Sequence, residues 1–264
     1  VYVVFFIIVH EVSGMSAKTI VITGALSGIG EECSYQFAYE KYNLIFSGLD
    51  IKQGEALQTK LRKVHPQCHF IMADVTDEKQ VINLIKFTIK IYGRVDVVIN
   101  SAGTEGHPST HENTTVDDFH HVFNTNVLGT QLVMKHALPI MCKQCFGSLI
   151  NISSRAGQAG VSGGGIYAAS KHAVNGLTRS AALEVAAKGV RVNAIAPGPV
   201  DTDLFDRFVG RDKVKKAAFL NRMPSGEIIT TKEIAGIALF LASDTARSII
   251  GQIITVDGGY SVGI

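Results

Sequence analysis

The sequence predicts an α/β fold, in which a single domain is built around one doubly wound sheet of seven parallel strands with helices on both faces. Short runs rich in Val and Ile alternate with longer helical patterns along most of the chain. These runs are apolar over their full length, which is typical of parallel strands covered on both sides. No repeat, low-complexity tract or linker-like run divides the 264 residues, and 46% of them are hydrophobic, enough for one large core.

The predicted elements follow one another in a regular order. Seven segments are expected to be strands: residues 19–23, 43–48, 69–74, 95–100, 147–153, 191–197 and 252–258. Six helices are expected between them, near residues 29–41, 52–64, 77–92, 117–145, 166–188 and 231–243. Right-handed crossovers would place these helices on both faces, and ligands of such sheets bind beyond the carboxyl ends of the strands.

The first turn carries a glycine-rich segment, TGALSGIG, at residues 23–30. Gly24 would permit a tight turn, Gly28 would let the backbone approach a pyrophosphate, and Gly30 would allow close packing of the helix. The helix that follows offers free N–H groups and a partial positive charge to phosphates. The strand, turn and helix together predict nucleotide binding.

A second motif places a phenol and an ammonium on one helical face. Tyr167 and Lys171 are four residues apart, a spacing that brings side chains together on a helix. A cation about 4 Å from a phenol would lower its pKa from near 10 to near 7, with desolvation of the lysine acting against this. We expect a Tyr167 that exchanges a proton with an alcohol or ketone. A tyrosine of the core is the alternative.

Taken together, the motifs resemble the short-chain dehydrogenase/reductase family in its form of about 250 residues, and within it 3-oxoacyl carrier-protein reductases and related ketone reductases. The resemblance covers residues 18–262 and follows the family's order of motifs: T-G-x-x-x-G-x-G, DV at 74–75, NSAG at 100–103, Tyr-x-x-x-Lys, PGPVDT at 197–202 and VDGG at 256–259. It implies a Rossmann fold and hydride transfer between NAD(P)(H) and a secondary alcohol or ketone.

The resemblance also implies four catalytic residues. Tyr167 would exchange the proton, with Lys171 beside it. Ser154 would hydrogen-bond the substrate oxygen, whereas the neighbouring Ser153 lies one position off the family spacing. Asn126 would hold a water molecule that relays protons from Lys171.

The cofactor site implied by the resemblance follows the carboxyl edge of the sheet. Asp74 would bind the adenine amino group, with Val75 packed on the ring. Thr202 would bind the nicotinamide carboxamide. Ser101 departs from the family, which usually has a second Asn there. The complete set is Gly24, Ser27, Gly28, Ile29, Gly30, Leu49, Asp50, Asp74, Val75, Asn100, Ala102, Gly103, Tyr167, Lys171, Pro197, Gly198, Val200 and Thr202.

The choice between NAD(H) and NADP(H) depends on the end of the second strand. An acidic residue there would bind the ribose hydroxyl groups and repel a 2′-phosphate. That position is Gly48, followed by Leu49, and Ser27 stands where many NADP-dependent relatives carry a base. Asp50 is close by, and Lys52 is the nearest cation. Because a 2′-phosphate needs an Arg or Lys partner, we expect NAD(H) to be favoured over NADP(H).

Substrate choice is expected to lie with residues 200–226, termed the lid. Phe205, Phe208 and Phe219 of the lid suit an apolar alcohol or ketone, while its lysines fit either a thioester substrate or a solvated face. The glycines at 163–165 would either leave room for a bulky substrate or meet the needs of a tight loop. A 3-oxoacyl thioester reductase is one alternative function, and a catalytically silent nucleotide-binding sensor or scaffold is another.

Composition narrows the other classes of function. A net charge of +2 with scattered Lys and Arg gives no basic stripe for nucleic acid. Cys142-x-x-Cys145 lacks the second pair of ligands that zinc needs, so reduced thiols in a cytoplasmic protein are expected. The histidines within 107–121 are interpreted as solvated, and no metal site is predicted.

Residues 1–14 are expected to be a translated leader or an expression-derived extension, ahead of an NAD(P)-binding domain at 15–264. The apolar run at 1–9 is shorter than the ~20 residues of a spanning helix, which leaves a weak membrane anchor as the competing interpretation. The resemblance further implies a homo-oligomer, either a dimer or a tetramer, built from the helices at 117–145 and 166–188.

Overall fold

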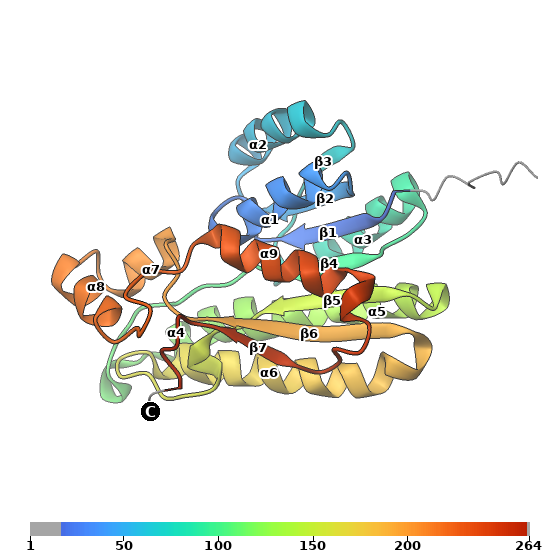
Figure 1. Cartoon of the computed structure of the whole chain (residues 1–264). Coiled ribbons are helices and arrows are strands. Elements are labelled where there is room, and N and C mark those ends of the chain that lie inside the picture. The colour runs from blue at the N-terminus through green and yellow to red at the C-terminus, as the bar shows by residue number, and fades with distance from the viewer. Residues whose placement is uncertain (1–16, 263–264) are drawn as a thin grey trace, which may run out of the picture.

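The predicted parallel sheet is confirmed by the computed structural model, which describes residues 17–262 (Figure 1). The strands lie in the order β3-β2-β1-β4-β5-β6-β7, and all of them are parallel. Their bounds are β1 Thr19–Thr23, β2 Asn43–Gly48, β3 Cys68–Met72, β4 Val97–Asn100, β5 Gly147–Ile152, β6 Val190–Pro197 and β7 Ile253–Val256. The sheet grows outwards from β1 and β4, and such a reversal of strand order creates a binding crevice at the carboxyl ends.

Helices cover both faces of the sheet (Figure 1). Ile20 and Ile22 of β1 point into one core and Val21 points into the other, because side chains alternate along a strand. The central strands are buried at every residue, whereas β3 and β7 at the edges are only partly buried. One face carries α1 (Gly28–Tyr39), α2 (Ile51–Val64) and α9 (Thr231–Ala242), and the other carries α3 (Glu78–Tyr92), α5 (Gly129–Gln144) and α6 (Gly165–Val185).

The single helix predicted over 117–145 is wrong, because the structure interrupts it. α4 (Val116–Phe123) leads into a π-helical turn, Asn124–Leu128, before α5 begins. The turn widens the helix where the carbonyl oxygen of Asn126 accepts a hydrogen bond from Thr130 Oγ1 at 2.8 Å. The apolar pattern of the segment continues through this point and therefore gives no sign of the interruption.

The lid contains two short helices that the sequence pattern did not predict, α7 (Asp203–Phe208) and α8 (Lys213–Leu220). Each begins after a capping residue, Thr202 for α7 and Asp212 for α8. The side chains of both residues accept hydrogen bonds from backbone N–H groups of the first turn. Side-chain caps thus define helices that are too short for a clear apolar period.

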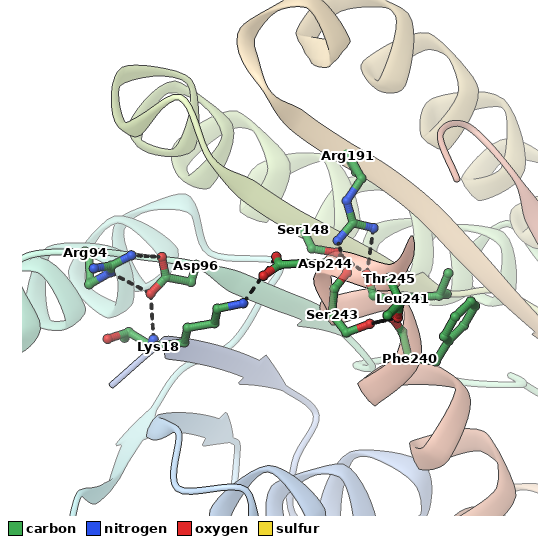
Figure 2. A network of polar contacts seen from close by, with 11 residues as sticks. Lys18, Arg94, Asp96, Ser148, Arg191, Phe240, Leu241, Ser243, Asp244 and Thr245 are labelled. Carbon is green, nitrogen blue, oxygen red and sulfur yellow. Dashed lines mark hydrogen bonds and ion pairs between the residues drawn. The ribbon is translucent and has the colours of Figure 1, made fainter. Parts of the chain in front are cut away.

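A network of polar side chains lies at the amino ends of the strands (Figure 2). Asp96, which is fully buried just before β4, accepts a hydrogen bond from the backbone N–H of Thr19 at 2.7 Å. The same carboxylate accepts two more from the guanidinium of Arg94, both at 2.7 Å. This network ties the beginning of β1 to the beginning of β4.

The same network caps the end of α9 (Figure 2). Arg191, at the start of β6, donates to the carbonyl oxygens of Leu241 at 2.7 Å and Ser243 at 3.1 Å. Ser148 Oγ, at the start of β5, donates to the carbonyl oxygen of Leu241 at 2.9 Å as well. Two strands therefore supply donors for carbonyl groups that a helix leaves without partners at its end.

The sequence also led to predictions about a leader, membrane spans, metal sites and the cysteines. The leader predicted at residues 1–14 lies outside the described residues. Within 17–262, no helix is both long and apolar enough to cross a membrane, and no three His, Cys, Asp or Glu side chains are grouped as metal ligands. The four cysteines are free thiols, and burial raises the pKa of Cys33 to about 12 and that of Cys68 to about 11.

Candidate active site

The segments that follow strands β1 to β6 surround a cavity of about 680 Å³. This volume is within the range of cofactor and small-molecule sites. Most of the residues predicted to form a site line its wall: Gly24, Ser27, Gly28, Ile29, Leu49, Asp50, Asp74, Val75, Ala102, Gly103, Ser154, Tyr167, Lys171, Pro197, Gly198, Val200 and Thr202. The fold therefore brings together nearly all of the motifs that were recognised separately along the chain.

The glycine turn has the geometry that its sequence predicts. Gly24 and Gly28 have φ angles of +62° and +55°, which are unfavourable for residues with a side chain. A Cβ on Gly24 would lie 2.5 Å from the backbone of Ala102, so only glycine lets the turn pass so close to the segment after β4. The side chain of Ser27, which precedes α1, makes no capping hydrogen bond in the described structure. The first N–H groups of α1 thus remain available to an anion.

Two of the predicted cofactor residues, Gly30 and Asn100, lie behind the wall. A Cβ on Gly30 would collide with the carbonyl oxygen of Gly24, so this glycine lets α1 pack against the turn. Asn100 Nδ2 donates to Asn151 Oδ1 at 2.8 Å, and Asn100 Oδ1 has no hydrogen-bond partner among the described residues. Both residues shape the cavity from behind instead of lining it.

Asn126 also lies behind the wall, where it holds the segment after β4. Its Oδ1 accepts from the backbone N–H of Thr104 at 2.8 Å, and its Nδ2 donates to the carbonyl oxygen of Thr104 at 2.9 Å and to Ser170 Oγ at 3.0 Å. A Cβ on Gly103 would lie 3.3 Å from Asn126 Oδ1 and 3.5 Å from Lys171 Nζ. Asn126 is thus close to the lysine, with both amide hydrogens used inside the protein.

Tyr167 and Lys171 lie in the first two turns of α6 and line the same cavity, as their spacing predicts. Lys171 Nζ lies 5.7 Å from the centroid of the Tyr167 ring and donates to the carbonyl oxygen of Ile152 at 2.9 Å. Ser154 is hydrogen-bonded to the Tyr167 phenol. Ser153 Oγ instead donates to the carbonyl oxygen of Lys171 at 3.4 Å. Ser154 is therefore the serine placed beside the phenol.

The expected lowering of the Tyr167 pKa is wrong for this structure. Burial raises the pKa of the phenol to about 12; the Ser154 hydrogen bond acts against this rise, and the Glu105 carboxylate adds to it. Burial also lowers the pKa of the Lys171 ammonium to about 8. The spacing of Tyr167 and Lys171 shows the nearby charge but not the burial of the phenol, and the cost of burying a phenolate dominates here. At neutral pH Tyr167 is a protonated phenol, ready to donate.

Charge is distributed unevenly along the cavity. The cations on its wall are Arg155, Lys171 and Arg207, which come from the segments after β5 and β6. The segment after β2 contributes Asp50, which caps α2 by accepting a hydrogen bond from the backbone N–H of Gln53. No Arg or Lys of the described wall comes from that segment. This end of the described wall therefore carries a carboxylate and no Arg or Lys.

The lid closes the other end of the cavity with aromatic side chains. Phe205, Phe208 and Phe219 line the wall, as predicted for an apolar substrate site. The ring of Phe208 lies 6.3 Å from that of Tyr167 between centroids. The apolar surface therefore extends to the phenol itself.

Several residues of the cavity wall were not predicted from the sequence. Tyr260 lies within it, and the Arg155 guanidinium is placed 4.2 Å from the centroid of the Tyr260 ring. An aromatic residue directly after the VDGG motif was the available signal for Tyr260. For Arg155 the signal was only its position after Ser154. Further unpredicted wall residues are Leu26, Gln53, Thr76, His121 and Val161.

The three glycines at the beginning of α6, Gly163 to Gly165, favour the tight-loop interpretation. Gly163 has a φ angle of +73°. A Cβ on Gly164 would lie 3.2 Å from the Phe208 ring, and one on Gly165 would lie 2.7 Å from the His111 ring. The loop is therefore packed against the lid and the segment after β4, which leaves little additional room for a substrate there.

Comparisons with known proteins agree with this architecture. A protein-family model described as "Enoyl-(Acyl carrier protein) reductase" matches residues 24–261. The chain is 37% identical to "Uncharacterized oxidoreductase YxjF" of Bacillus subtilis, over 94% of this chain and 99% of that protein. The crystal structure of levodione reductase matches with a TM-score of 0.91 and 32% identity, over 94% and 98% of the two chains. A structure of ElxO with NADP bound matches with a TM-score of 0.87 and 33% identity, over 92% and 98%.

Proposed function

The chain belongs to the short-chain dehydrogenase/reductase family, and on this premise we propose that Ser154, Tyr167 and Lys171 interconvert an apolar ketone and its secondary alcohol. Like its relatives, the chain is an NAD(P)-dependent oxidoreductase of secondary alcohols and ketones. One observation supports the residue assignment above all others. The three side chains line the cavity that also contains the glycine turn, so proton donor and dinucleotide would meet there.

In the reducing direction, the phenol of Tyr167 donates its proton to the carbonyl oxygen of the substrate. A reduced nicotinamide, when bound, supplies the hydride that adds to the carbonyl carbon. Negative charge grows on the oxygen during this addition, and the hydroxyl groups of Ser154 and Tyr167 stabilise it as hydrogen-bond donors. Tyr167 is left as a phenolate, whose charge the Lys171 ammonium compensates. The water-holding role of Asn126 stays a proposal, and its side chain supports a positioning role next to Lys171.

NAD(H) is the cofactor that the wall of this chain supports best. Asp50 lies at the end of the cavity where the adenosine ribose, which carries the 2′-phosphate in NADP, would be placed. None of the described wall cations is at this end. The similar ElxO structure contains NADP, so any preference must come from the residues of this chain itself.

Fluorescence titration with NADH and NADPH tests the cofactor preference. We expect NADH to bind at least about tenfold more tightly, which is about 1.4 kcal/mol. Asp50→Asn should narrow the difference because it removes the repulsion of the 2′-phosphate. Glu55→Gln removes a charge from an exposed position of the same helix, α2, and should leave the ratio unchanged. Equal or tighter binding of NADPH by the unmodified chain would contradict the proposal.

The substrate is proposed to be an uncharged, apolar ketone. The lid contributes three phenylalanines to the wall, whereas Lys213 and Lys215 are exposed and Lys216 is paired with Asp206 at 2.8 Å. The lysines of the lid therefore match a solvated face better than a thioester-binding surface. A screen with the preferred cofactor should show turnover of cyclic or aromatic ketones in preference to a 3-oxoacyl thioester. Cofactor binding without turnover of any carbonyl compound would instead favour the silent sensor.

A homo-oligomer is proposed to form through α4, α5 and α6. Large apolar side chains are exposed on these helices and on the π-helical turn between α4 and α5, including Val116, Phe119, Leu128 and Leu183. Sedimentation of the purified chain should give the mass of a dimer or tetramer, and a monomer at micromolar concentration would contradict this. A cytoplasmic location is proposed from the four free thiols, which fit a reducing compartment.

A further inference from the structure

An ion pair between Arg207, on the cavity wall, and Glu105, behind it, connects the lid to the segment after β4. Glu105 belongs to that segment, and only 5% of its side chain is exposed. Arg207 of α7 donates to both of its carboxylate oxygens, through Nε at 2.6 Å and through Nη2 at 3.2 Å. Two parallel bonds to a buried carboxylate are the geometry in which such pairs are strongest.

The Glu105 end of this pair is anchored to the catalytic helix. Asn126 holds Thr104, the preceding residue, by both its N–H and its carbonyl group. The same Asn126 side chain donates to Ser170 Oγ, which donates in turn to the carbonyl oxygen of Tyr167 at 2.7 Å. The carboxylate therefore has a fixed position relative to the helix that carries the phenol.

The Arg207 end brings an aromatic ring to the phenol. Phe208 is the next residue of α7, and its ring centroid lies 6.3 Å from that of Tyr167 and 6.2 Å from that of Phe219. A Cβ on Gly164 would lie 3.2 Å from the same ring. One short helix thus provides a cation for Glu105 and an apolar cover for Tyr167 at the same time.

We propose that Glu105 and Arg207 are a positioning pair that fastens the lid over Tyr167 and neutralises a negative charge next to the reacting phenol. This inference rests on the proposed function. An unpaired Glu105 carboxylate would hold the proton on Tyr167 more tightly, because like charges disfavour a phenolate. The carboxylate already acts in this direction on the pKa of Tyr167. Proton exchange is therefore easiest when α7 is in place.

Among the described residues, few other charged or titratable groups near Tyr167 could influence the pKa of its phenol. Lys171 reaches it from its own helix, and Arg155 lies on the same cavity wall after β5. His121 of α4 lines the cavity, with its Nε2 lying 3.4 Å from Thr104 Oγ1. Of the described charged residues of the cavity wall, the lid carries Asp203 and Arg207, and Arg207 is the one paired with Glu105. Movement of the lid would thus remove the cation that neutralises the Glu105 carboxylate.

The pH dependence of alcohol oxidation tests the charge role, because Tyr167 must be deprotonated to accept a proton in that direction. Arg207→Met leaves the carboxylate unpaired and should move the rise of kcat/KM to higher pH by about one pH unit. Glu105→Gln removes the negative charge and should move the rise to lower pH. Lys216→Met breaks another ion pair of the lid, the one with Asp206, and should leave the pH at which kcat/KM rises unchanged. If the pair had a purely structural role, the pH at which kcat/KM rises would shift in the same direction in Arg207→Met and Glu105→Gln. That result would overturn the proposal.

Hydrogen exchange of the α7 amides tests the fastening role without any turnover. We expect about tenfold faster exchange in Glu105→Gln and Arg207→Met, and intermediate exchange in Arg207→Lys, which keeps the charge but loses the two-bond geometry. Unchanged exchange in both single variants would overturn the inference. If the unmodified chain oxidises no alcohol and reduces no ketone, the proposed function fails, while the exchange rates still decide whether the pair fastens the lid.

Discussion

Asp96 and Arg191 at the amino ends of the strands and Lys171 at the carboxyl ends are all less than a tenth exposed, but their surroundings differ. Asp96 accepts three hydrogen bonds and Arg191 donates two, all within a closed network (Figure 2). Lys171 lines an open cavity, and the one described hydrogen bond of its ammonium goes to Ile152. Buried charge with full partners holds elements together, whereas buried charge with few partners costs stability and is available for chemistry.

The largest stability effect is expected from Asp96→Ala at the amino ends. The substitution leaves the buried N–H of Thr19 without a partner and breaks the pair with Arg94. Because the Arg94 side chain is 38% exposed and water can solvate it, we expect a loss of about 3 kcal/mol in the free energy of unfolding. Urea unfolding measures this loss, and kcat per folded molecule should stay the same. A loss below about 1 kcal/mol would show that the network does not stabilise the fold.

Lys171→Met should raise the free energy of unfolding, whereas Asp96→Ala lowers it. This is the sharpest contrast between the amino and the carboxyl ends of the strands. The pKa of Lys171 falls from 10.5 to about 8 on folding, so keeping the ammonium charged at pH 7 costs about 3 kcal/mol. Allowing about 1 kcal/mol for the lost hydrogen bond to Ile152, the variant should be about 2 kcal/mol more stable at pH 7.

The pH dependence of this gain provides its control. The cost of the Lys171 charge is complete below the folded pKa of about 8, and it disappears as the pH rises from about 8 to 10.5, where the unfolded chain also loses the proton. Urea unfolding at pH 7 and pH 10 should therefore show a smaller difference between variant and unmodified chain at the higher pH. A destabilised variant at pH 7 would contradict this reading of the carboxyl ends.

The smallest effect is expected from Arg191→Met. Two carbonyl groups at the end of α9 lose a donor, but the carbonyl of Leu241 keeps its hydrogen bond from Ser148 Oγ. We expect a loss of about 1 kcal/mol. In the double variant with Ser148→Ala the loss should exceed the sum of the two single losses, because that carbonyl then has no donor. If the two losses of unfolding free energy simply add in urea unfolding, the two donors do not stabilise the same carbonyl group.

Much of the fold was predictable because strand and helix patterns carry it locally. The strands β1 and β2 were predicted with the bounds that the structure has, and the glycine turn showed its φ requirements through Gly24 and Gly28. The π-helical turn before α5 was not predictable, because the apolar pattern of the sequence continues through it. Within this turn, Asn126 Oδ1 accepts a hydrogen bond from the backbone N–H of Thr104, a residue in another segment, and sequence patterns do not show such a contact.

The site was predictable to the extent that its residues belong to motifs. Ser154, Tyr167 and Lys171 lie where their motifs placed them, around one cavity. The pKa of Tyr167 was not predictable, because burial dominates it and burial depends on how the lid and the segment after β4 pack. Tyr260 and Glu105 were not predictable for the same reason. Only tertiary packing brings Tyr260 into the cavity wall and Glu105 next to Arg207.

The most direct test is a comparison of Tyr167→Phe with the unmodified chain for both NADH binding and ketone reduction. The variant keeps the ring beside Phe208 and loses only the proton donor, while Tyr39→Phe, at an exposed site on α1, serves as the matched control. We predict NADH affinity within about twofold of the original and turnover reduced by about a thousandfold. Turnover close to that of the unmodified chain would contradict the claim that this phenol exchanges the proton.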